Sequence, residues 1–134
     1  MRILLDTHLL LWALTNDSHL PEQARRLIED PSNDIYYSVI GAWEVQIKHM
    51  LHPDELIVGA EDITAFCNDA GYRVLLLKLN HIFALNNLTR KTDAPTHKDP
   101  FDRMLICQAS SEGMLFLTHD KRLRHYDDSC IFVV

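Results

Sequence analysis

The chain opens with Met1-Arg2-Ile3-Leu4-Leu5-Asp6-Thr7-His8, a short apolar run that ends abruptly in a carboxylate. A continuous apolar run, as opposed to an alternating one, is typical of a parallel strand that is covered on both faces. A helix-like pattern over residues 8–14 follows at once. In open α/β sheets, the working groups lie just beyond the carboxyl ends of the strands. The opening therefore predicts an α/β fold and makes Asp6 the first candidate site residue.

The rest of the chain alternates between strand-like and helix-like segments, without repeats or a linker. Strands are predicted over residues 2–6, 35–38, 73–77 and 114–118, with an edge strand over 131–134. Helices are predicted over residues 8–14, 21–28, 39–51, 63–70, 80–88 and 99–112, with a helical turn at 121–124 and a polar loop over 89–98. Strands separated by helices predict a parallel sheet with helices on both faces. At 134 residues, we expect one domain spanning residues 1–134.

Composition is that of an ordinary globular protein, with 47% hydrophobic and 24% charged residues. No segment approaches the roughly 20 apolar residues that span a membrane, and the N-terminus lacks the features of a signal peptide. We therefore expect a cytoplasmic protein without a membrane partner. The three cysteines are widely spaced and are expected to be free thiols. The eight histidines match no zinc motif, so their spacing does not predict a histidine-based metal site.

Further acids lie at the boundaries of the predicted elements, and each has a purely structural explanation as well. Asp6 and Asp120 are each placed to cap a following helical segment. Asp99 precedes Pro100, which is a strong N-cap pattern, and Asp102 then falls in the first helical turn, where an acid favours the helix dipole. Taken singly, none of these four acids requires a function.

Glu44 is harder to explain by capping, because it lies in the middle of the helix predicted over residues 39–51. We expect it to border an apolar stripe made of Ile40, Trp43, Ile47 and Met50. A solvent-exposed glutamate on a helix is the commonest situation, so Glu44 alone does not identify a site.

The combination of acids is more specific than any one of them. A parallel sheet would bring Asp6, Asp102 and Asp120 to one edge, with Glu44 one helical turn in from it. Carboxylates that converge repel one another unless a cation joins them, and all-oxygen ligands select hard cations such as Mg²⁺ or Mn²⁺. Such ions activate water for attack on a phosphodiester. The hydroxyl of Thr118 is placed to orient that water or a ligand.

The distribution of charge is uneven, although the whole chain carries a formal net charge of −6. The segment 88–126 holds seven basic and five acidic side chains, while residues 1–87 hold six basic and twelve acidic ones. A net negative surface argues against indiscriminate nucleic-acid binding, but this segment also holds three of the candidate acids. The candidate phosphate-binding side chains are therefore Lys98, Arg103, Lys121 and Arg122.

Four stretches of the chain resemble the four motifs of the PIN-domain family. They are Leu-Leu-Asp6-Thr7-His8-Leu-Leu-Leu-Trp12, Ser38 followed by Ala-Trp-Glu44, His97-Lys-Asp99-Pro-Phe-Asp102-Arg103, and Leu-Thr118-His-Asp120. The resemblance covers essentially the whole chain and is greatest to VapC-like toxins of toxin–antitoxin pairs. Two small departures occur, at Val39-Ile40-Gly41 before the Trp-Glu pair, and at His119, where arginine is common.

The resemblance implies an α/β fold, specifically a three-layer α/β/α sandwich around a central parallel sheet of four to five strands. It implies a Mg²⁺- or Mn²⁺-dependent ribonuclease, a hydrolase of RNA phosphodiesters, that forms a homodimer and is inhibited by a small antitoxin protein. By position, the metal ligands would be Asp6, Glu44, Asp102 and Asp120, with Asp99 as an accessory acid.

Other protein classes fit the sequence less well. A phospho-receiver domain needs an aspartate after its third strand, where this chain has Leu77-Lys78-Leu79-Asn80. An aspartyl phosphatase needs a second aspartate at position 8, which is a histidine, and the four glycines are too dispersed for a nucleotide-binding loop. The alternative that stays open is a PIN fold that binds RNA or protein with little or no catalysis.

Overall fold

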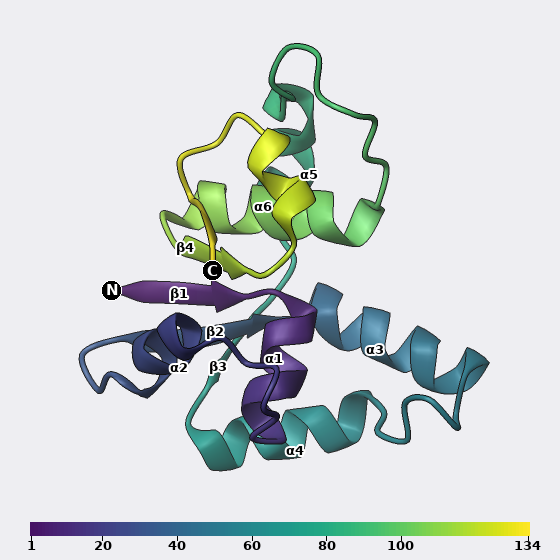
Figure 1. Ribbon diagram of the computed structural model, residues 1–134. Helices are drawn as coiled ribbons and strands as arrows, with labels where there is room; N and C mark the ends of the chain where they lie inside the picture. Colours follow the sequence, from purple (N-terminus) through teal and green to yellow (C-terminus); the bar gives the residue numbers. More distant parts are fainter.

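The computed structural model describes all residues from 1 to 134, and its centre is a five-stranded sheet in which every neighbouring pair is parallel. The strands lie in the order β3-β2-β1-β4-β5 (Figure 1). Their bounds are Arg2–Leu5 (β1), Asp34–Ser38 (β2), Arg73–Leu75 (β3), Leu115–Thr118 (β4) and Ile131–Val133 (β5). The opening apolar run is thus the central strand, as its unbroken hydrophobicity predicts.

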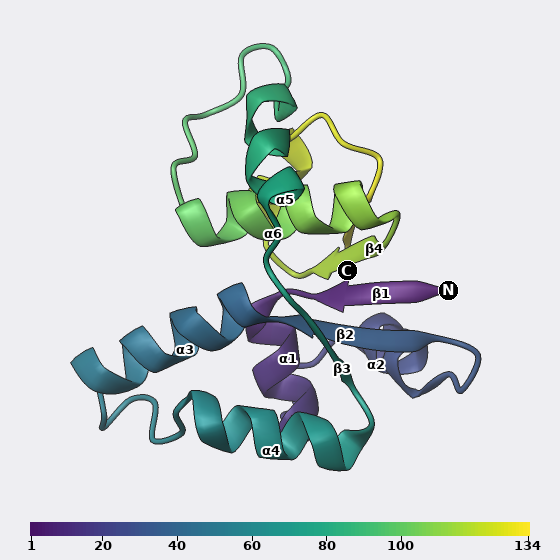
Figure 2. The same cartoon turned by 180° about the vertical axis from the view of Figure 1, so that it is seen from behind.

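Helices cover both faces of this sheet. Their bounds are Thr7–Leu14 (α1), Glu22–Glu29 (α2), Val39–Leu51 (α3), Ala60–Ala70 (α4), Leu79–Phe83 (α5) and Pro100–Glu112 (α6), with 3-10 turns at Ala84–Asn87 (η1) and Lys121–His125 (η2). Helices α1, α2 and α4 lie on one face, and α5, α6 and η2 lie on the other (Figures 1 and 2). The predicted three-layer α/β/α sandwich with a parallel sheet is confirmed.

Side-chain alternation on β1 divides the core between the two faces. Ile3 and Leu5 pack with α1, α2 and α4, and Leu4 packs with α6 and η2. All three side chains are at most 2% exposed. Because every residue of this strand after Arg2 is apolar, both faces are filled, and the strand can stand nowhere but in the middle of the sheet.

The sheet register brings three chain segments to one edge. Leu5 pairs with Leu117, and Leu4 pairs with Tyr36, so that β1, β2 and β4 all end at the same side. The backbone N–H of Asp6 donates to the carbonyl of Leu117 at 2.9 Å, which extends the ladder by one residue. The residues that directly follow these strands therefore meet there.

Each helical segment that begins at this edge is capped by a polar side chain. Asp6 accepts from the N–H of Thr7 at 2.7 Å, and Ser38 accepts from the N–H of Ile40 at 2.9 Å. Asp99 accepts from the first turn of α6, and Asp120 from that of η2. The structural explanation given for Asp6, Asp99 and Asp120 is therefore confirmed, and a cap leaves each side chain at the edge where a site would form.

The predicted apolar stripe of α3 is wrong. Trp43 and Met50 are 58% and 71% exposed, whereas Glu44 and Val45 are buried. The first half of α3 lies against the layers on both sides of the sheet edge, so its packing follows from that position and not from the periodicity of its apolar residues. None of the helices has the length and the apolar content that crossing a membrane requires.

Candidate metal centre

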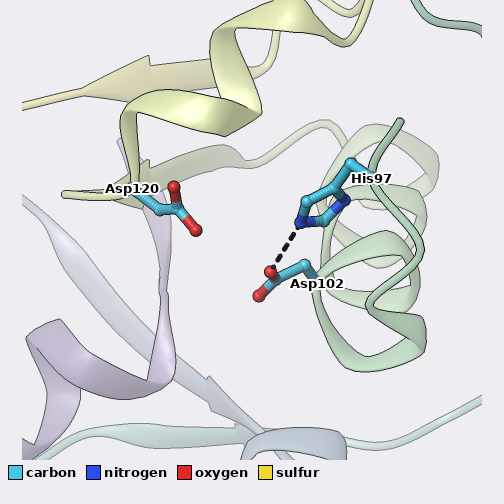
Figure 3. A group of neighbouring side chains, drawn as sticks. All are labelled: His97, Asp102 and Asp120. Carbon is cyan, nitrogen blue, oxygen red and sulfur yellow. Dashed lines mark ion pairs between the residues drawn. The ribbon is translucent and has the colours of Figure 1, made fainter. Parts of the chain in front are cut away.

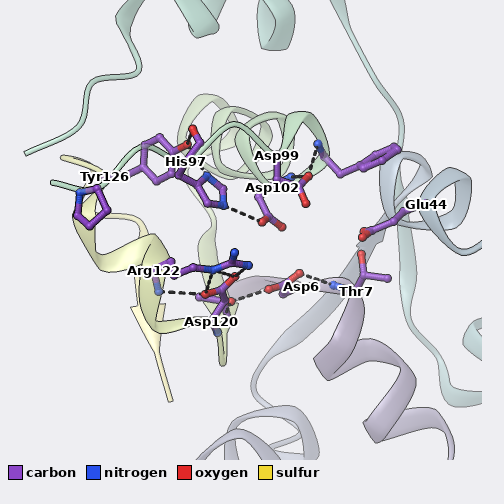
Figure 4. A network of polar contacts seen from close by, with 12 residues as sticks. Asp6, Thr7, Glu44, His97, Asp99, Asp102, Asp120, Arg122 and Tyr126 are labelled. Atoms are coloured by element: carbon purple, nitrogen blue, oxygen red, sulfur yellow. Dashed lines mark hydrogen bonds and ion pairs between the residues drawn. The ribbon is translucent and has the colours of Figure 1, made fainter. Parts of the chain in front are cut away.

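Four carboxylates from four different segments face a common space at the carboxyl edge of the sheet (Figure 4). Asp6 follows β1, Glu44 lies on α3, Asp102 lies in the first turn of α6, and Asp120 follows β4. Three of them, Asp6, Glu44 and Asp102, are between 5% and 8% exposed. The structure thus brings together the acids that the sequence identifies as candidate metal ligands.

Asp6 is held at both of its oxygens. Its Oδ1 accepts from the backbone of Thr7, and its Oδ2 accepts from the hydroxyl of Thr118 at 2.5 Å. The same hydroxyl accepts from the backbone N–H of Asp120 at 3.0 Å. Thr118 is fully buried, so its hydroxyl fixes two of the acids relative to each other. The geometry favours a positioning role for Thr118 over direct contact with a water or ligand.

Glu44 enters the site because α1 and α3 approach closely. A Cβ at Gly41 would lie 3.2 Å from Oγ1 of Thr7, so a glycine here lets the helices come together. The Oε2 of Glu44 lies 3.3 Å from the ammonium of Lys48. Its Oε1 is buried without a hydrogen-bond partner. A buried carboxylate oxygen without a partner is costly, and a bound cation would satisfy it.

Asp102 faces the site from α6, and Asp99 and His97 lie close to it in the chain. Asp99 accepts from the N–H groups of Phe101 and Asp102, at 2.9 and 3.2 Å, and so fixes the start of the helix. The Nε2 of His97 lies 3.2 Å from Oδ2 of Asp102 (Figure 3). This approach does not have hydrogen-bond geometry, and Nε2 is buried without a partner.

Asp120 is paired with a candidate phosphate-binding residue. The guanidinium of Arg122 holds both of its oxygens, with Nη2 2.7 Å from Oδ2 and Nε 3.0 Å from Oδ1. Arg122 is itself solvent-exposed. The positive charge of Arg122 neutralises that of Asp120. A phosphate would compete with Asp120 for Arg122, and a metal ion would compete with Arg122 for Asp120.

The pKa values of the acids reflect their burial and their closeness to one another. Burial, followed by the charge of Asp6, raises the pKa of Asp102 to about 8. Burial also raises the pKa of Asp6, although hydrogen bonds from Thr118 and Thr7 oppose the shift. The hydrogen bonds from Arg122 lower the pKa of Asp120. Burial and charge repulsion therefore disfavour the ionised forms of Asp6 and Asp102 most. A bound divalent cation would relieve this repulsion.

His97 is held neutral by its surroundings. Burial, followed by the charges of Arg122 and Arg90, lowers the pKa of this imidazole. Its contact with Asp102 is therefore not an ion pair between a full cation and a full anion near neutral pH.

The donor set fits a divalent cation. It offers carboxylate oxygens from four segments, and unpartnered buried atoms of Glu44 and His97 border the same space. One donor atom from each of His97, Asp102 and Asp120 lies within 4.8 Å of the other two, whereas Asp6 and Glu44 do not belong to this closest group. Carboxylate oxygens suit Mg²⁺ and Mn²⁺, and an imidazole nitrogen suits transition ions.

The other candidate phosphate-binding residues are sequence neighbours of the acids. Lys98 and Lys121 are exposed, and Arg103 is half-buried on α6. A pocket of about 260 Å³ opens beside the acids and is lined by Asp6, His8, Trp12, His119 and Asp120. Solvent can therefore reach the space between the carboxylates from this side.

Comparison with known protein families identifies the family of this chain. The family model of the PIN domain matches residues 3–129, which is nearly the whole chain. The chain belongs to the PIN-domain family. No curated protein sequence matches it closely enough to add a relative.

Solved structures share the PIN fold of this chain at low sequence identity. A crystal structure of VapBC2 from Rickettsia felis bound to a DNA fragment from their promoter superimposes with a TM-score of 0.69 at 14% identity, covering 100% of this chain and 99% of that one. A crystal structure of DNA-bound VapBC from Salmonella typhimurium gives 0.68 at 18% identity, covering 99% and 98%. The predicted PIN-family resemblance is confirmed.

The sequence did not predict that His97 and Tyr126 would lie at this PIN-domain site. Histidine spacing argued against any histidine ligand, and His97 stood in a segment predicted to be a polar loop. Its place depends on Tyr126, whose hydroxyl lies 2.7 Å from its Nδ1. The sequence feature that could have pointed to His97 is its place at the start of the third PIN-like motif, two residues before the cap of α6.

Proposed function

We propose that this PIN-domain protein is a metal-dependent endoribonuclease, and that it is the toxin of a toxin–antitoxin pair. The observation that carries the proposal is the convergence of four carboxylates, three of them buried, at one edge of the sheet. Such an arrangement is costly for the metal-free protein and has a direct use in binding Mg²⁺ or Mn²⁺.

Asp6, Glu44, Asp102 and Asp120 would hold the cation. When bound, the ion supplies an activated water and stabilises negative charge on the phosphodiester and on the leaving oxygen. Thr118 holds Asp6 and the backbone of Asp120 in place, and Asp99 fixes the start of the helix that presents Asp102. An outer-shell water held by Asp99 remains part of this proposal.

The basic residues would position the RNA. Lys98, Arg103 and Lys121 would bind phosphates on either side of the cleaved bond. Arg122 would exchange its contact with Asp120 for a phosphate oxygen when RNA and the ion arrive together. After this exchange Arg122 would be paired with the phosphate, and Asp120 with the cation.

The partners follow from the resemblance to VapC-like toxins. The solved structures that share the fold are named as VapBC complexes bound to DNA. We therefore propose a small antitoxin and a homodimer for this chain, which we take to act as a single domain. All three cysteines are free, which suits the proposed cytoplasmic location.

Cleavage of structured RNA by the purified protein in Mg²⁺ or Mn²⁺ tests the proposal. Both EDTA and Asp6→Asn should abolish cleavage, while Asp127→Asn, an exposed acid on the far side of η2 in the chain, should leave it unchanged. Cleavage that survives Asp6→Asn would overturn the assignment. Absence of cleavage in a folded protein that binds the ion would instead favour the binding-module alternative.

A further inference from the structure

Outside the four acids, the side chain at the site that the proposed function leaves without a role is His97. It lies in the segment between η1 and α6, and its side chain is 4% exposed. Its Nε2 points toward Asp102 and, across the same space, Asp120 (Figure 3). A buried nitrogen without a hydrogen-bond partner needs an explanation.

The segment that carries His97 is fixed against η2 by several contacts. The N–H of Lys91 donates to the carbonyl of His125 at 2.7 Å, and the N–H of Asp127 donates to the carbonyl of Thr89 at 2.9 Å. The guanidinium of Arg90 lies 4.7 Å from the ring centroid of Tyr126. These contacts hold residues 89–91 against the chain around Tyr126, and Tyr126 in turn contacts the ring of His97. A ring that is already positioned binds a ligand at lower cost.

Tyr126 contacts the ring nitrogen of His97 that faces away from the acids. The hydroxyl of Tyr126 lies 2.7 Å from Nδ1 of the ring, and it donates to the backbone carbonyl of His97 at 3.4 Å. A hydroxyl has one hydrogen, so it accepts from Nδ1 when it donates to the carbonyl, and it donates to Nδ1 in the other tautomer. A metal ion would bind the tautomer in which Nδ1 carries the hydrogen, because Nε2 then presents a lone pair toward Asp102. Two electron-rich atoms 3.2 Å apart repel each other unless a proton or a cation lies between them.

The spacing is that of two ligands of one ion. Two donor atoms at a right angle on an ion with bonds of about 2.1 Å lie about 3.0 Å apart. The observed 3.2 Å between Nε2 and Oδ2 of Asp102 is close to this value. A tyrosine hydroxyl on the other ring nitrogen is also the kind of contact that orients a metal-binding histidine.

We propose that His97 is a direct ligand of the metal ion, through Nε2, together with Asp102 and Asp120. The site is then a mixed nitrogen and oxygen centre that selects a first-row transition ion such as Mn²⁺ over Mg²⁺. The proposal rests on the proposed function only in sharing its acidic site, because the ligand set can be measured without any RNA.

Pulsed electron paramagnetic resonance of the Mn²⁺-loaded full chain tests the proposal. The wild type should show the hyperfine coupling of a directly bound imidazole nitrogen. His97→Gln should lose this coupling and bind Mn²⁺ roughly 10- to 100-fold more weakly, while its affinity for Mg²⁺ should change less. His119→Gln and His8→Gln are the matched controls, because both residues line the adjacent pocket, and both variants should keep the coupling.

The outcomes separate the two proposals. Tight Mn²⁺ binding without nitrogen coupling in the wild type would overturn His97 as a ligand and leave the nuclease proposal intact. Coupling that persists in His97→Gln but vanishes in His8→Gln or His119→Gln would assign the ligand to another histidine. No Mn²⁺ binding by the wild type would overturn both proposals. If His97→Gln fails to fold, the spectra of the wild type, His8→Gln and His119→Gln together still decide the matter, because coupling kept in all three leaves His97 as the ligand.

Discussion

Replacing Asp102 with asparagine should stabilise the metal-free protein, even though it should abolish metal-dependent activity. Asparagine has nearly the same shape and carries no charge. Burial and the neighbouring Asp6 raise the pKa of Asp102 from 3.8 to about 8. The unfolded chain therefore releases this proton at a lower pH than the folded protein does, and ionisation of Asp102 opposes folding.

The sign and size of the effect follow from proton linkage. Between about pH 4 and pH 8 the unfolded state binds fewer protons at this position, so the free energy of unfolding of the wild type falls as the pH rises. A shift from 3.8 to about 8 corresponds to about 6 kcal/mol above pH 8. Relaxation of the site and entry of water should leave about 2 to 4 kcal/mol of this. The gap between Asp102→Asn and the wild type should widen from pH 4 to pH 8 and then stay constant.

Urea unfolding in EDTA at several pH values measures this gap, with the fluorescence of Trp12 and Trp43 as the probe. Asp127→Asn is the matched control at an exposed position and should show no widening. Saturating Mn²⁺ should stabilise the wild type and narrow or reverse its difference from Asp102→Asn. An Asp102→Asn protein that is less stable than the wild type at pH 8.5 would refute the argument that these carboxylates repel one another in the metal-free site.

Three other substitutions test how the structure supports the site. Ser38→Ala removes the cap of α3 and a 2.5 Å hydrogen bond to Gln108, and should cost about 1 to 3 kcal/mol in urea unfolding. Glu112→Gln weakens the contact with His81, whose hydrogen bond lowers the pKa of Glu112. The substitution should cost about 1 to 2 kcal/mol of unfolding free energy at pH 7. This cost should disappear as the pH falls below 4, because protonation of Glu112 removes the same contribution from the wild type. Thr118→Val should lower metal-dependent cleavage roughly 10- to 100-fold with an unchanged circular dichroism spectrum, and Thr118→Ser should restore it.

The sequence predicted the fold well because its signals are local and agree with one another. The unbroken run Ile3-Leu4-Leu5 specifies a strand covered on both faces, and Asp99-Pro100 marks the first turn of α6 to the residue. Asp6 and Asp99 were explained in advance both as caps and as site residues. The two explanations are compatible, because a helix that starts at the carboxyl edge of a parallel sheet places its cap beside the ligand-binding crevice.

The sequence could not predict features that depend on how separate layers meet. Periodicity placed Trp43 in the core and Glu44 at its border, but the position of α3 at the sheet edge exposes Trp43 and buries Glu44. His97 lies in a segment without periodicity, and its orientation is set by Tyr126, which is 29 residues away in the chain. Neither placement follows from local propensity or from spacing.

Most of the acids at the site have a counter-group from this chain. Thr118 donates to Asp6, Lys48 lies beside Glu44, and Arg122 holds both oxygens of Asp120. The protein thus meets part of the cost of gathering four carboxylates without any ion.

Asp102 is the exception. Its Oδ2 lies 3.2 Å from Nε2 of His97, a nitrogen that makes no hydrogen bond. Its pKa is accordingly raised to about 8, by burial first and then by the charges of the neighbouring acids, Asp6 foremost. A cation is bound most favourably where it relieves the largest unfavourable interaction, so most of its binding free energy should come from Asp102 and His97. Less should come from Asp120, because the ion must first displace Arg122 from this carboxylate. Affinity for the ion should therefore depend more on the α6 side of the site than on the β4 side.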